Sequence, residues 1–455
     1  MPGSTYKSGI IMPPTLTLGW LDRLFPMILR PRLEFLKAQA KLGDVTHFRA
    51  GPFTIYLINH PDLIRDVLVV NADKFMKGRA LQRSRTLLGN GLLTSEGEFH
   101  LRQRRMIQPA FHRSRIADYS RSMTAFAEAW SSVRIDGETL DIDQEMMRLT
   151  LQIVAKALFN ADVTGDAGEI GKALTSLVEM FNLLLLPFSE VLEQLPLPQS
   201  LRLKRSRATL DRIIFGIIDE RRKSGADTPE NTGDRLSMLL AARDEDDGGQ
   251  MTDTQVRDEA LTLFLAGHET TAVALTWTWY LLSQNPQAEV KLHEELDAVL
   301  SGRVPNIDDI QDLKFTEHVL AESMRLFPPA WAIGRQALED HELGGFRIPK
   351  GSTVLMSPAI LQRDERFWPD ADEFKPERWD TQSVKEAGQR NIYFPFGGGT
   401  RRCIGGGFAW TEGILLLATI ARKWRFRLDP AQKIDSKPLI TLRPKYGMRM
   451  SVTAR

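Results

Sequence analysis

The sequence predicts a mainly α fold with a small β region. Apolar residues recur with helical spacing from about residue 62 to about residue 325. Strand-like pieces are fewer and occur near the beginning of the chain, at residues 337–355, where glycine and proline punctuate them, and near the end of the chain. No Gly/Ser-rich linker, repeat or low-complexity run divides the 455 residues, so we expect one domain over 1–455.

Local signals place the individual elements. Residues 45–57 alternate β-branched and aromatic side chains around a turn at 50–52, which is typical of two short strands. Thr252 and Gln255 form a capping box at the start of the longest predicted helix. Helices are predicted at 115–132, 143–159, 168–185, 203–224, 253–285 and 286–300. We also expect a strand at 352–356, a last helix at about 406–424 and a closing hairpin over 440–453.

Composition and charge exclude several classes of partner. The chain is 42% hydrophobic and 26% charged, which is typical of a globular protein. Its formal net charge of +1, with acids and bases interspersed, indicates neither a nucleic acid nor an anionic membrane as partner. The N-terminal segment 1–40 lacks an apolar stretch long enough to span a bilayer, so we expect no membrane anchor and a soluble, cytoplasmic protein.

The single cysteine, Cys403, lies between two glycine clusters directly before a predicted helix. A helix amino terminus and the neighbouring Arg401 and Arg402 favour an anion, so we expect a lowered thiol pKa. The glycines allow a flat ligand to approach and let backbone N–H groups donate to the sulfur. A tight turn, a phosphate-binding loop or an inert core thiol are the simpler interpretations, but a phosphate loop would need a Lys-Ser/Thr ending.

This loop resembles the haem-binding signature FxxGxRxCxG of the cytochrome P450 family, with matches at Phe396, Gly399, Arg401, Cys403 and Gly405. The resemblance implies the cytochrome P450 fold, in which a long central helix lies over a haem and the cysteine loop lies on the proximal side. It implies haem b (iron protoporphyrin IX) with Cys403 as the axial thiolate, Phe396 beside the sulfur and Arg401 on a haem propionate. A thiolate ligand favours cleavage of an iron-bound O–O bond, so the implied activity is that of a monooxygenase using O2.

The long helix at 253–285 carries a second motif. Ala266, Gly267 and Thr270 share one face, because residues three and four apart are stacked on a helix. Packing against a neighbouring helix is the simpler interpretation of such small residues, but a buried Glu269 beside Thr270 is costly without a polar task. Residues 266–271 resemble the family's oxygen-activation motif, which implies proton delivery by Glu269 and Thr270 and places Ala266 and Gly267 beside the haem.

Further matches support the resemblance. Glu322 and Arg325 on one helix, followed by Arg378, match the family's ExxR and PERF-like elements and imply a buried structural network. His100 and Arg104 resemble a propionate-binding pair, although His100 replaces the tryptophan often found there. Arg335 matches a third propionate partner of some relatives. Taken singly, each of these charges is more simply a solvated surface group.

Substrate-binding segments of relatives correspond here to apolar residues, which implies a small hydrophobic substrate such as a fatty acid, terpenoid or hydrocarbon. They are Leu87, Leu88, Leu92, Leu183, Leu184, Leu263, Ala266, Ala330, Trp331, Ile333 and Ile440. Ordinary core packing is the alternative interpretation of this set.

The chain contains no flavin, nicotinamide or ferredoxin-type motif, so electrons must come from separate proteins, a ferredoxin or flavodoxin with its reductase. A basic patch from Arg104, Arg105, Arg401 and Arg402 suits an acidic carrier of this kind. We expect a monomer. A non-catalytic haem-thiolate sensor or ligand carrier, and a structural helical protein with an inert cysteine, stay open at this point.

Overall fold

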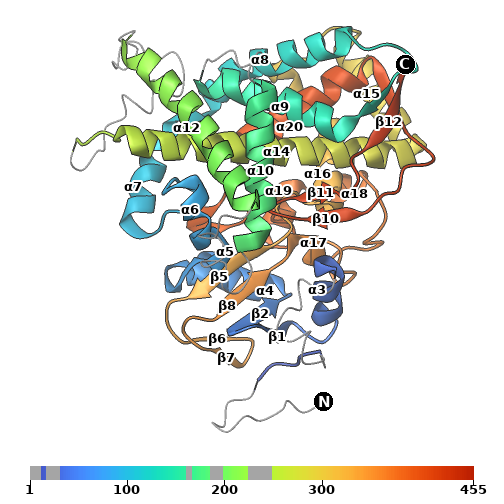
Figure 1. Cartoon of the computed structure of the whole chain (residues 1–455). Helices are drawn as coiled ribbons and strands as arrows, with labels where there is room; N and C mark the ends of the chain where they lie inside the picture. The colour runs from blue at the N-terminus through green and yellow to red at the C-terminus, as the bar shows by residue number, and fades with distance from the viewer. Residues whose placement is uncertain (1–11, 17–30, 160–166, 185–197, 224–247) are drawn as a thin grey trace.

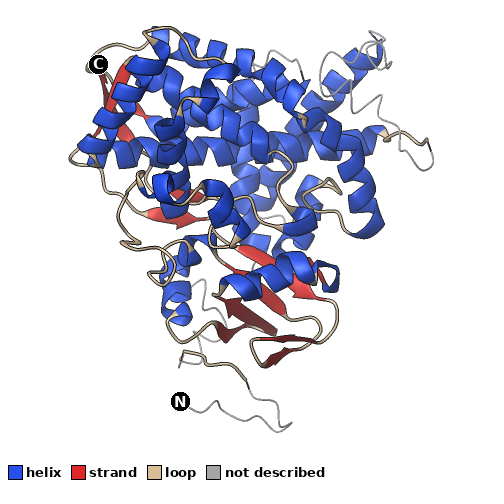
Figure 2. Cartoon of the chain, turned by 180° about the vertical axis from the view of Figure 1, so that it is seen from behind, coloured by secondary structure: helices blue, strands red, loops and turns tan. Residues whose placement is uncertain are grey.

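Helices fill the upper part of the molecule in Figure 1, whereas the largest sheet lies in the lower part, and Figure 2 shows the same division from behind. The computed structural model describes residues 12–16, 31–159, 167–184, 198–223 and 248–455. The longer helices are α3 (Arg32–Ala40), α7 (Gly97–Ile107), α8 (Arg113–Ser132), α9 (Ile142–Phe159), α10 (Ala167–Leu184), α12 (Pro198–Lys223), α14 (Asp253–Gln284), α15 (Pro286–Leu300), α16 (Lys314–Leu326) and α20 (Gly406–Ala421). Shorter helices are α4 (Pro61–Arg65), η1 (Asp66–Val70), η2 (Ala72–Lys74), α5 (Arg79–Arg83), α6 (Arg85–Leu88), η3 (Gln108–Phe111), η5 (Ile307–Gln311), α17 (Pro358–Leu361), α18 (Arg378–Thr381), α19 (Val384–Gln389) and η6 (Gly399–Arg401).

The helix α14 crosses the whole helical part (Figure 1). Its 32 residues span about 48 Å at 1.5 Å per residue. The predicted capping box is present: the Gln255 N–H donates to Thr252 Oγ1 (3.2 Å), and the Thr252 N–H donates to Gln255 Oε1 (2.8 Å). The helix ends at Gln284, because Pro286 cannot continue its hydrogen bonding.

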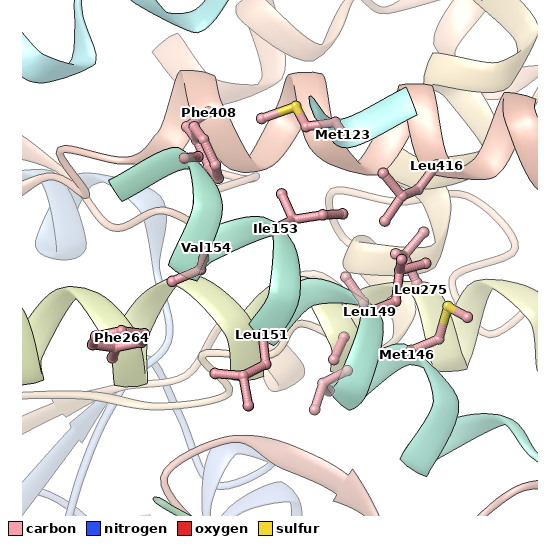
Figure 3. Close-up of a cluster of buried hydrophobic side chains, with 14 of the residues drawn as sticks. Met123, Met146, Leu149, Leu151, Ile153, Val154, Phe264, Leu275, Phe408 and Leu416 are labelled. Carbon is pink, nitrogen blue, oxygen red and sulfur yellow. The ribbon is translucent and has the colours of Figure 1, made fainter. Parts of the chain in front are cut away.

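The neighbours of α14 form the main hydrophobic core. Figure 3 shows α9 between α14 and α20, with Phe264 of α14 on one side and Phe408 of α20 on the other. Polar contacts fix the same packing, since Thr150 Oγ1 of α9 donates to the His268 carbonyl of α14 (2.9 Å). In the described ranges, no helix has the length and apolar character needed to cross a membrane.

The β region is built from distant segments. The largest sheet has the order β1-β2-β8-β5-β3, in which β2 and β8 are parallel and the other pairs are antiparallel. Its strands are β1 (Val45–Ala50), β2 (Phe53–Ile58), β3 (Phe75–Lys77), β5 (Ile333–Ala337) and β8 (Thr353–Met356), and β6 (His341–Leu343) pairs with β7 (Phe346–Ile348). The turn between β1 and β2 is where the sequence predicted it, at Gly51, whose φ is 60°.

At the end of the chain, the predicted last helix is present but ends three residues earlier than expected, and the prediction of a closing hairpin is wrong. The last helix stops at Ala421, because β9 (Trp424–Leu428) pairs with β12 (Arg449–Ala454). No closing hairpin joins the ends of 440–453: β11 (Leu442–Pro444) pairs with β10 (Ser436–Pro438), while β12 also pairs with β4 (Thr139–Asp141). Pro438 and Pro444 lie at strand ends, where the missing N–H costs no ladder hydrogen bond.

Candidate active site

Backbone hydrogen bonds shape the cysteine loop. The Cys403 N–H donates to the Phe396 carbonyl (2.9 Å), and the Arg402 N–H donates to the Gly399 carbonyl (3.1 Å). Gly399 has a φ of 65°, and a Cβ atom there would lie 1.8 Å from the Leu68 carbonyl oxygen of η1. Only glycine fits at this position, because any side chain would clash with η1.

The Cys403 sulfur has donors and cations around it. The Gly405 amide donates to the sulfur, and the guanidinium groups of Arg104 and Arg402 lie close enough to favour the thiolate. Arg104 Nη1 also donates to the Arg402 carbonyl (3.0 Å). Burial nevertheless raises the pKa of the Cys403 thiol and outweighs these three effects, so the lowered pKa expected from the sequence is wrong. A metal cation at the sulfur would remove its proton outright.

The rings beside the loop belong to α20 and to the loop itself. Phe396 and Trp410 form an edge-to-face pair with centroids 6.0 Å apart. A Cβ atom on Gly406 would lie 3.5 Å from the Phe396 ring, and one on Gly405 would lie 3.2 Å from Phe111. The glycines therefore let the first turn of α20 pack closely on aromatic rings.

One face of α14 is uncovered near its middle. Ala266 is exposed and Thr270 is partly exposed in a helix whose other residues are mostly buried, and Thr270 Oγ1 donates to the Ala266 carbonyl (2.7 Å). Gly267 is small because α9 packs against it: a Cβ atom at this position would lie 2.7 Å from Val154 of α9. Gly267 thus permits close helix packing, the simpler of the two interpretations that the sequence offered.

Glu269 and Thr270 have different surroundings. Glu269 Oε1 accepts hydrogen bonds from Thr441 Oγ1 (2.5 Å) and Arg443 Nε (3.1 Å), both of which follow β10, while Glu269 Oε2 has no partner among the described residues. Asp143 at the start of α9 is near this cluster. Burial raises its pKa to about 6, the Asp141 and Glu269 carboxylates add to the rise, and Arg443 opposes it.

A cluster of cations lies next to the cysteine loop. Arg401 Nη2 pairs with Glu96 (2.5 Å). Burial lowers the pKa of Lys77 to about 7 and that of Arg335 to about 10, and the Arg401 charge lowers both further. Burial, followed by the Lys77 and Arg401 charges, lowers the pKa of His100 to about 3. Positive charge therefore exceeds negative charge in this buried region.

Glu322, Arg325 and Arg378 form one network. Glu322 accepts hydrogen bonds from Arg325 Nε (2.8 Å) and Nη2 (2.9 Å) and from Arg378 Nε (2.8 Å). Arg325 Nη1 donates to the carbonyls of Gln362 (2.7 Å) and Ala371 (2.6 Å). Glu322 and Arg325 are fully buried, so each charge depends on its partners. The network joins α16 to the segment that leads into the cysteine loop.

Comparisons with known proteins agree with this arrangement. Residues 14–450 match the family described as Cytochrome P450. The chain belongs to the cytochrome P450 family. It is 42% identical to "Cyclooctatin synthase" of Streptomyces melanosporofaciens, over 91% of this chain and 90% of that protein. It is 37% identical to "Pentalenene oxygenase" of Streptomyces avermitilis, over 94% of each chain, and 38% identical to "Cyclooctat-9-en-7-ol 5-monooxygenase" of Streptomyces melanosporofaciens, over 88% and 86%.

As a cytochrome P450, the chain is a haem-dependent monooxygenase that acts on a hydrophobic substrate and takes electrons from redox partners. Its residues fit a haem. Burial, together with the Arg401 charge, lowers the pKa of Lys77 and Arg335, and two carboxylates bound among these three cations would balance the positive charge. His100 Nε2 is buried without a hydrogen-bond partner in the described part of the chain, and Cys403 supplies the sulfur that the P450 family uses.

The residues expected in the P450 substrate pocket do not form a single cluster. Leu87, Leu88, Leu92, Leu263 and Ile440 belong to the main core cluster around α14. Trp331 and Ile333 belong to two other core clusters.

Trp331 and Ile333 pack against other parts of the molecule. Trp331 packs in a separate core cluster with Phe48 and donates its indole N–H to the Leu439 carbonyl (2.9 Å). Ile333 packs on the β-sheet core and lies 3.7 Å from where a Cβ of Gly397 would be. Ala330 is half-buried, and the side chains of Leu183 and Leu184 lie outside the described residues.

Sequence reasoning missed Lys77, Glu96, Thr441 and Arg443. Each contacts the candidate site from a segment far away in the chain, such as Arg443, which is 174 residues from Glu269. A single lysine in a three-residue strand gives no periodic signal. The only indication available in the sequence was that charged side chains interrupt otherwise strand-like segments.

Proposed function

We propose that this chain binds haem b through Cys403 and inserts one oxygen atom from O2 into a terpenoid-like hydrocarbon. The observation that carries the proposal is that the sole cysteine and Arg401 lie in one loop. In that loop the Cys403 sulfur accepts a backbone N–H, and Arg401 belongs to the buried cluster in which positive charge exceeds negative charge. A thiolate-bound haem supplies activation of O2, because the thiolate pushes electron density toward the iron.

The proposed roles of the cationic residues follow from their positions. Arg401 and Arg335 bind the haem carboxylates, with Lys77 adding a third positive charge. His100 donates from Nε2, the ring nitrogen left without a partner among the described residues. Arg104 of α7 contacts the cysteine loop, where its guanidinium favours the Cys403 thiolate. Phe396 and Gly405 shape the sulfur's surroundings, and Ala266 and Gly267 contribute the backbone of α14.

Proton movement is assigned to Glu269 and Thr270. The Thr270 hydroxyl lies on the uncovered face of α14, where it can pass a proton to an oxygen atom. Glu269 receives two hydrogen bonds on Oε1, so Oε2 is the oxygen left to take up and release a proton. Arg443 and Thr441 hold this carboxylate in a fixed orientation.

A terpenoid substrate is supported by two observations. The proposed pocket residues Leu87, Leu88, Leu92 and Leu263 are all apolar and lie around α14. The printed names of three relatives refer to cyclooctatin, pentalenene and cyclooctat-9-en-7-ol. We assign Ala330, Ile333 and Ile440 to the edges of the pocket.

A ferredoxin or flavodoxin is the proposed electron donor. Arg105 of α7 and Arg402 of the cysteine loop are exposed, and their neighbours Arg104 and Arg401 are partly exposed. We further propose that the protein acts as a monomer in the cytoplasm.

Turnover with isotopically labelled oxygen tests the proposal. The haem-loaded protein is supplied with NADPH, a surrogate ferredoxin and its reductase, and a panel of cyclic terpene hydrocarbons and linear fatty acids. We expect one atom of 18O from 18O2 in a terpene product and none with Cys403→Ala. Absence of labelled product with every terpene, or label retained by Cys403→Ala, would contradict the proposal.

A further inference from the structure

The segment 89–95 joins α6 to α7. Two successive acidic residues of α14, Asp258 and Glu259, accept hydrogen bonds from its backbone. Asp258 Oδ2 accepts the Asn90 N–H (2.7 Å), and Glu259 Oε2 accepts the Leu92 N–H (2.8 Å). Gly89 has a φ of 74°, and a Cβ atom there would lie 2.0 Å from Asp258 Oδ1. The segment therefore lies directly on α14, with no room for a side chain at its first residue.

A buried ammonium group holds the same segment from the opposite side. Lys77 Nζ of β3 donates to the carbonyls of Leu92 (2.7 Å) and Ser95 (2.8 Å), and it lies 3.3 Å from His100 Nδ1. The N–H of Leu92 is thus bound by a carboxylate on α14, and its carbonyl is bound by a cation on β3.

Both ionisable groups are costly to bury in their charged forms. Glu259 is fully buried and Lys77 is 5% exposed. Burial raises the pKa of Glu259 to about 8, although the Leu92 N–H and the Lys77 charge oppose the rise. Burial likewise lowers the pKa of Lys77 to about 7. Neither group takes part in the proposed proton movement, so their burial needs another reason.

Lys77 also belongs to the cation cluster proposed to bind the haem carboxylates. Its charge is disfavoured by Arg401 and Arg335 and favoured by Glu96 and Glu259. Two bound carboxylates would neutralise the repulsion from Arg401 and Arg335 and so favour the ammonium form of Lys77. Because an ammonium donates stronger hydrogen bonds than a neutral amine, haem binding would tighten the hold on Leu92.

We propose that Lys77 and Glu259 form a clamp on the Leu92 backbone that fixes one wall of the substrate pocket and orders this wall when the haem carboxylates bind. The inference rests on the proposed function, which assigns the propionates to this cluster and Leu92 to the pocket. Lys77 and Glu259 are positioning residues, because they act through the Leu92 peptide. Their chemical effect is to set where the Leu92 side chain meets a hydrophobic substrate.

Amide hydrogen exchange of the haem-loaded protein tests the clamp. The amides of Asn90, Leu92, Thr94 and Ser95 are hydrogen-bonded, so they report opening of the segment. We expect them to exchange about tenfold faster or more in Lys77→Met and in Glu259→Leu, because one side of the clamp is lost. Lys74→Met is the matched control, since Lys74 is more exposed and pairs with Glu339 outside the clamp.

Two further readouts separate the clamp from the proposed function. Haem loading should slow exchange of the segment in the wild type but not in Lys77→Met, and Glu259→Leu should give a broader product distribution at unchanged peroxide yield. Exchange rates and products equal to the wild type in both variants would overturn the clamp. The absorption spectrum of the loaded wild type reports on Cys403 ligation independently, so failure there would instead refute the proposed function.

Discussion

At the scale of single residues, buried charge is placed where it has partners or a task. Cys403, Asp143 and Glu259 are acids whose pKa is raised mainly by burial, and each lies next to a cation that favours its ionised form. Asp143 and Glu269 both lie near Arg443; the Glu269 carboxylate raises the pKa of Asp143, and Arg443 opposes that rise.

Thr270→Ala tests the proton relay. The hydroxyl is proposed to deliver protons during turnover, and a positioned donor typically contributes about 10²-fold or more. We expect product formed per O2 consumed to fall strongly while peroxide rises, measured by oxygen uptake and product analysis. Thr270→Ser keeps the hydroxyl and should stay close to the wild type. Full coupling in Thr270→Ala would remove this residue from proton delivery.

Asp143→Asn tests the raised pKa at the start of α9. The pKa of Asp143 is about 6 in the folded protein and about 3.9 in an unfolded chain, so its ionisation opposes folding and stability is lost as pH rises from about 4 to 6. Relative to Asp143→Asn, the wild type should lose up to about 3 kcal/mol of unfolding free energy over this range. Denaturant unfolding at several pH values measures the difference. Parallel pH profiles for the two proteins would contradict it.

At the scale of elements, long-range contacts decide what local patterns leave open. The sequence predicted α14, its capping box and α9 closely, because helix periodicity and caps are local signals. The pairing of β12 with β9 and β4, and of β3 with β5, depends on contacts between distant segments and could not be read from alternation alone.

In the candidate site, too, residues of local motifs could be predicted from the sequence, whereas residues that come from distant segments could not. The motif residues around Cys403, Glu269 and Glu322 were predictable, because each motif is contiguous or shows a fixed spacing. Lys77 and Arg443 were not, because their role arises only when β3 and β11 fold against other elements. The direction of the Cys403 pKa was mispredicted, because the loop sequence reveals the donors and cations near the thiol but not how strongly the surrounding chain desolvates it.

Glu322→Gln tests the network that joins α16 to the cysteine loop. Removing one charge of a fully buried pair leaves Arg325 without a counter-ion, which costs about 3–5 kcal/mol of unfolding free energy. Asp118→Asn breaks an exposed pair of the same spacing with Arg121 and should cost about 0.5 kcal/mol or less. Denaturant unfolding compares the two. Equal, small losses would show that the buried network does not stabilise the fold.

At the scale of the whole molecule, a helical core supports a surface on which charge is locally uneven. The near-zero net charge leaves any steering of a redox partner to local patches such as the one around Arg105 and Arg402. That residues 1–455 form one domain stays a prediction, and the largest core cluster joins α8, α9, α14 and α20.

Charge reversal at Arg105 or Arg402 tests the proposed docking patch. Arg105→Glu and Arg402→Glu should slow reduction by an acidic ferredoxin about tenfold or more at low ionic strength, and the difference should shrink as salt screens the charges. Stopped-flow reduction rates give the comparison. Lys291→Glu, an exposed cation on α15, serves as the control. Rates that match the wild type at every salt concentration would place the docking surface elsewhere.

X-ray absorption at the iron edge of the haem-loaded wild type tests the central claim most directly. Ligation by the Cys403 thiolate predicts one sulfur scatterer bound to iron in the wild type and none in Cys403→Ala. A spectrum of the wild type that contains only nitrogen and oxygen neighbours, or a sulfur scatterer that persists in Cys403→Ala, would contradict it.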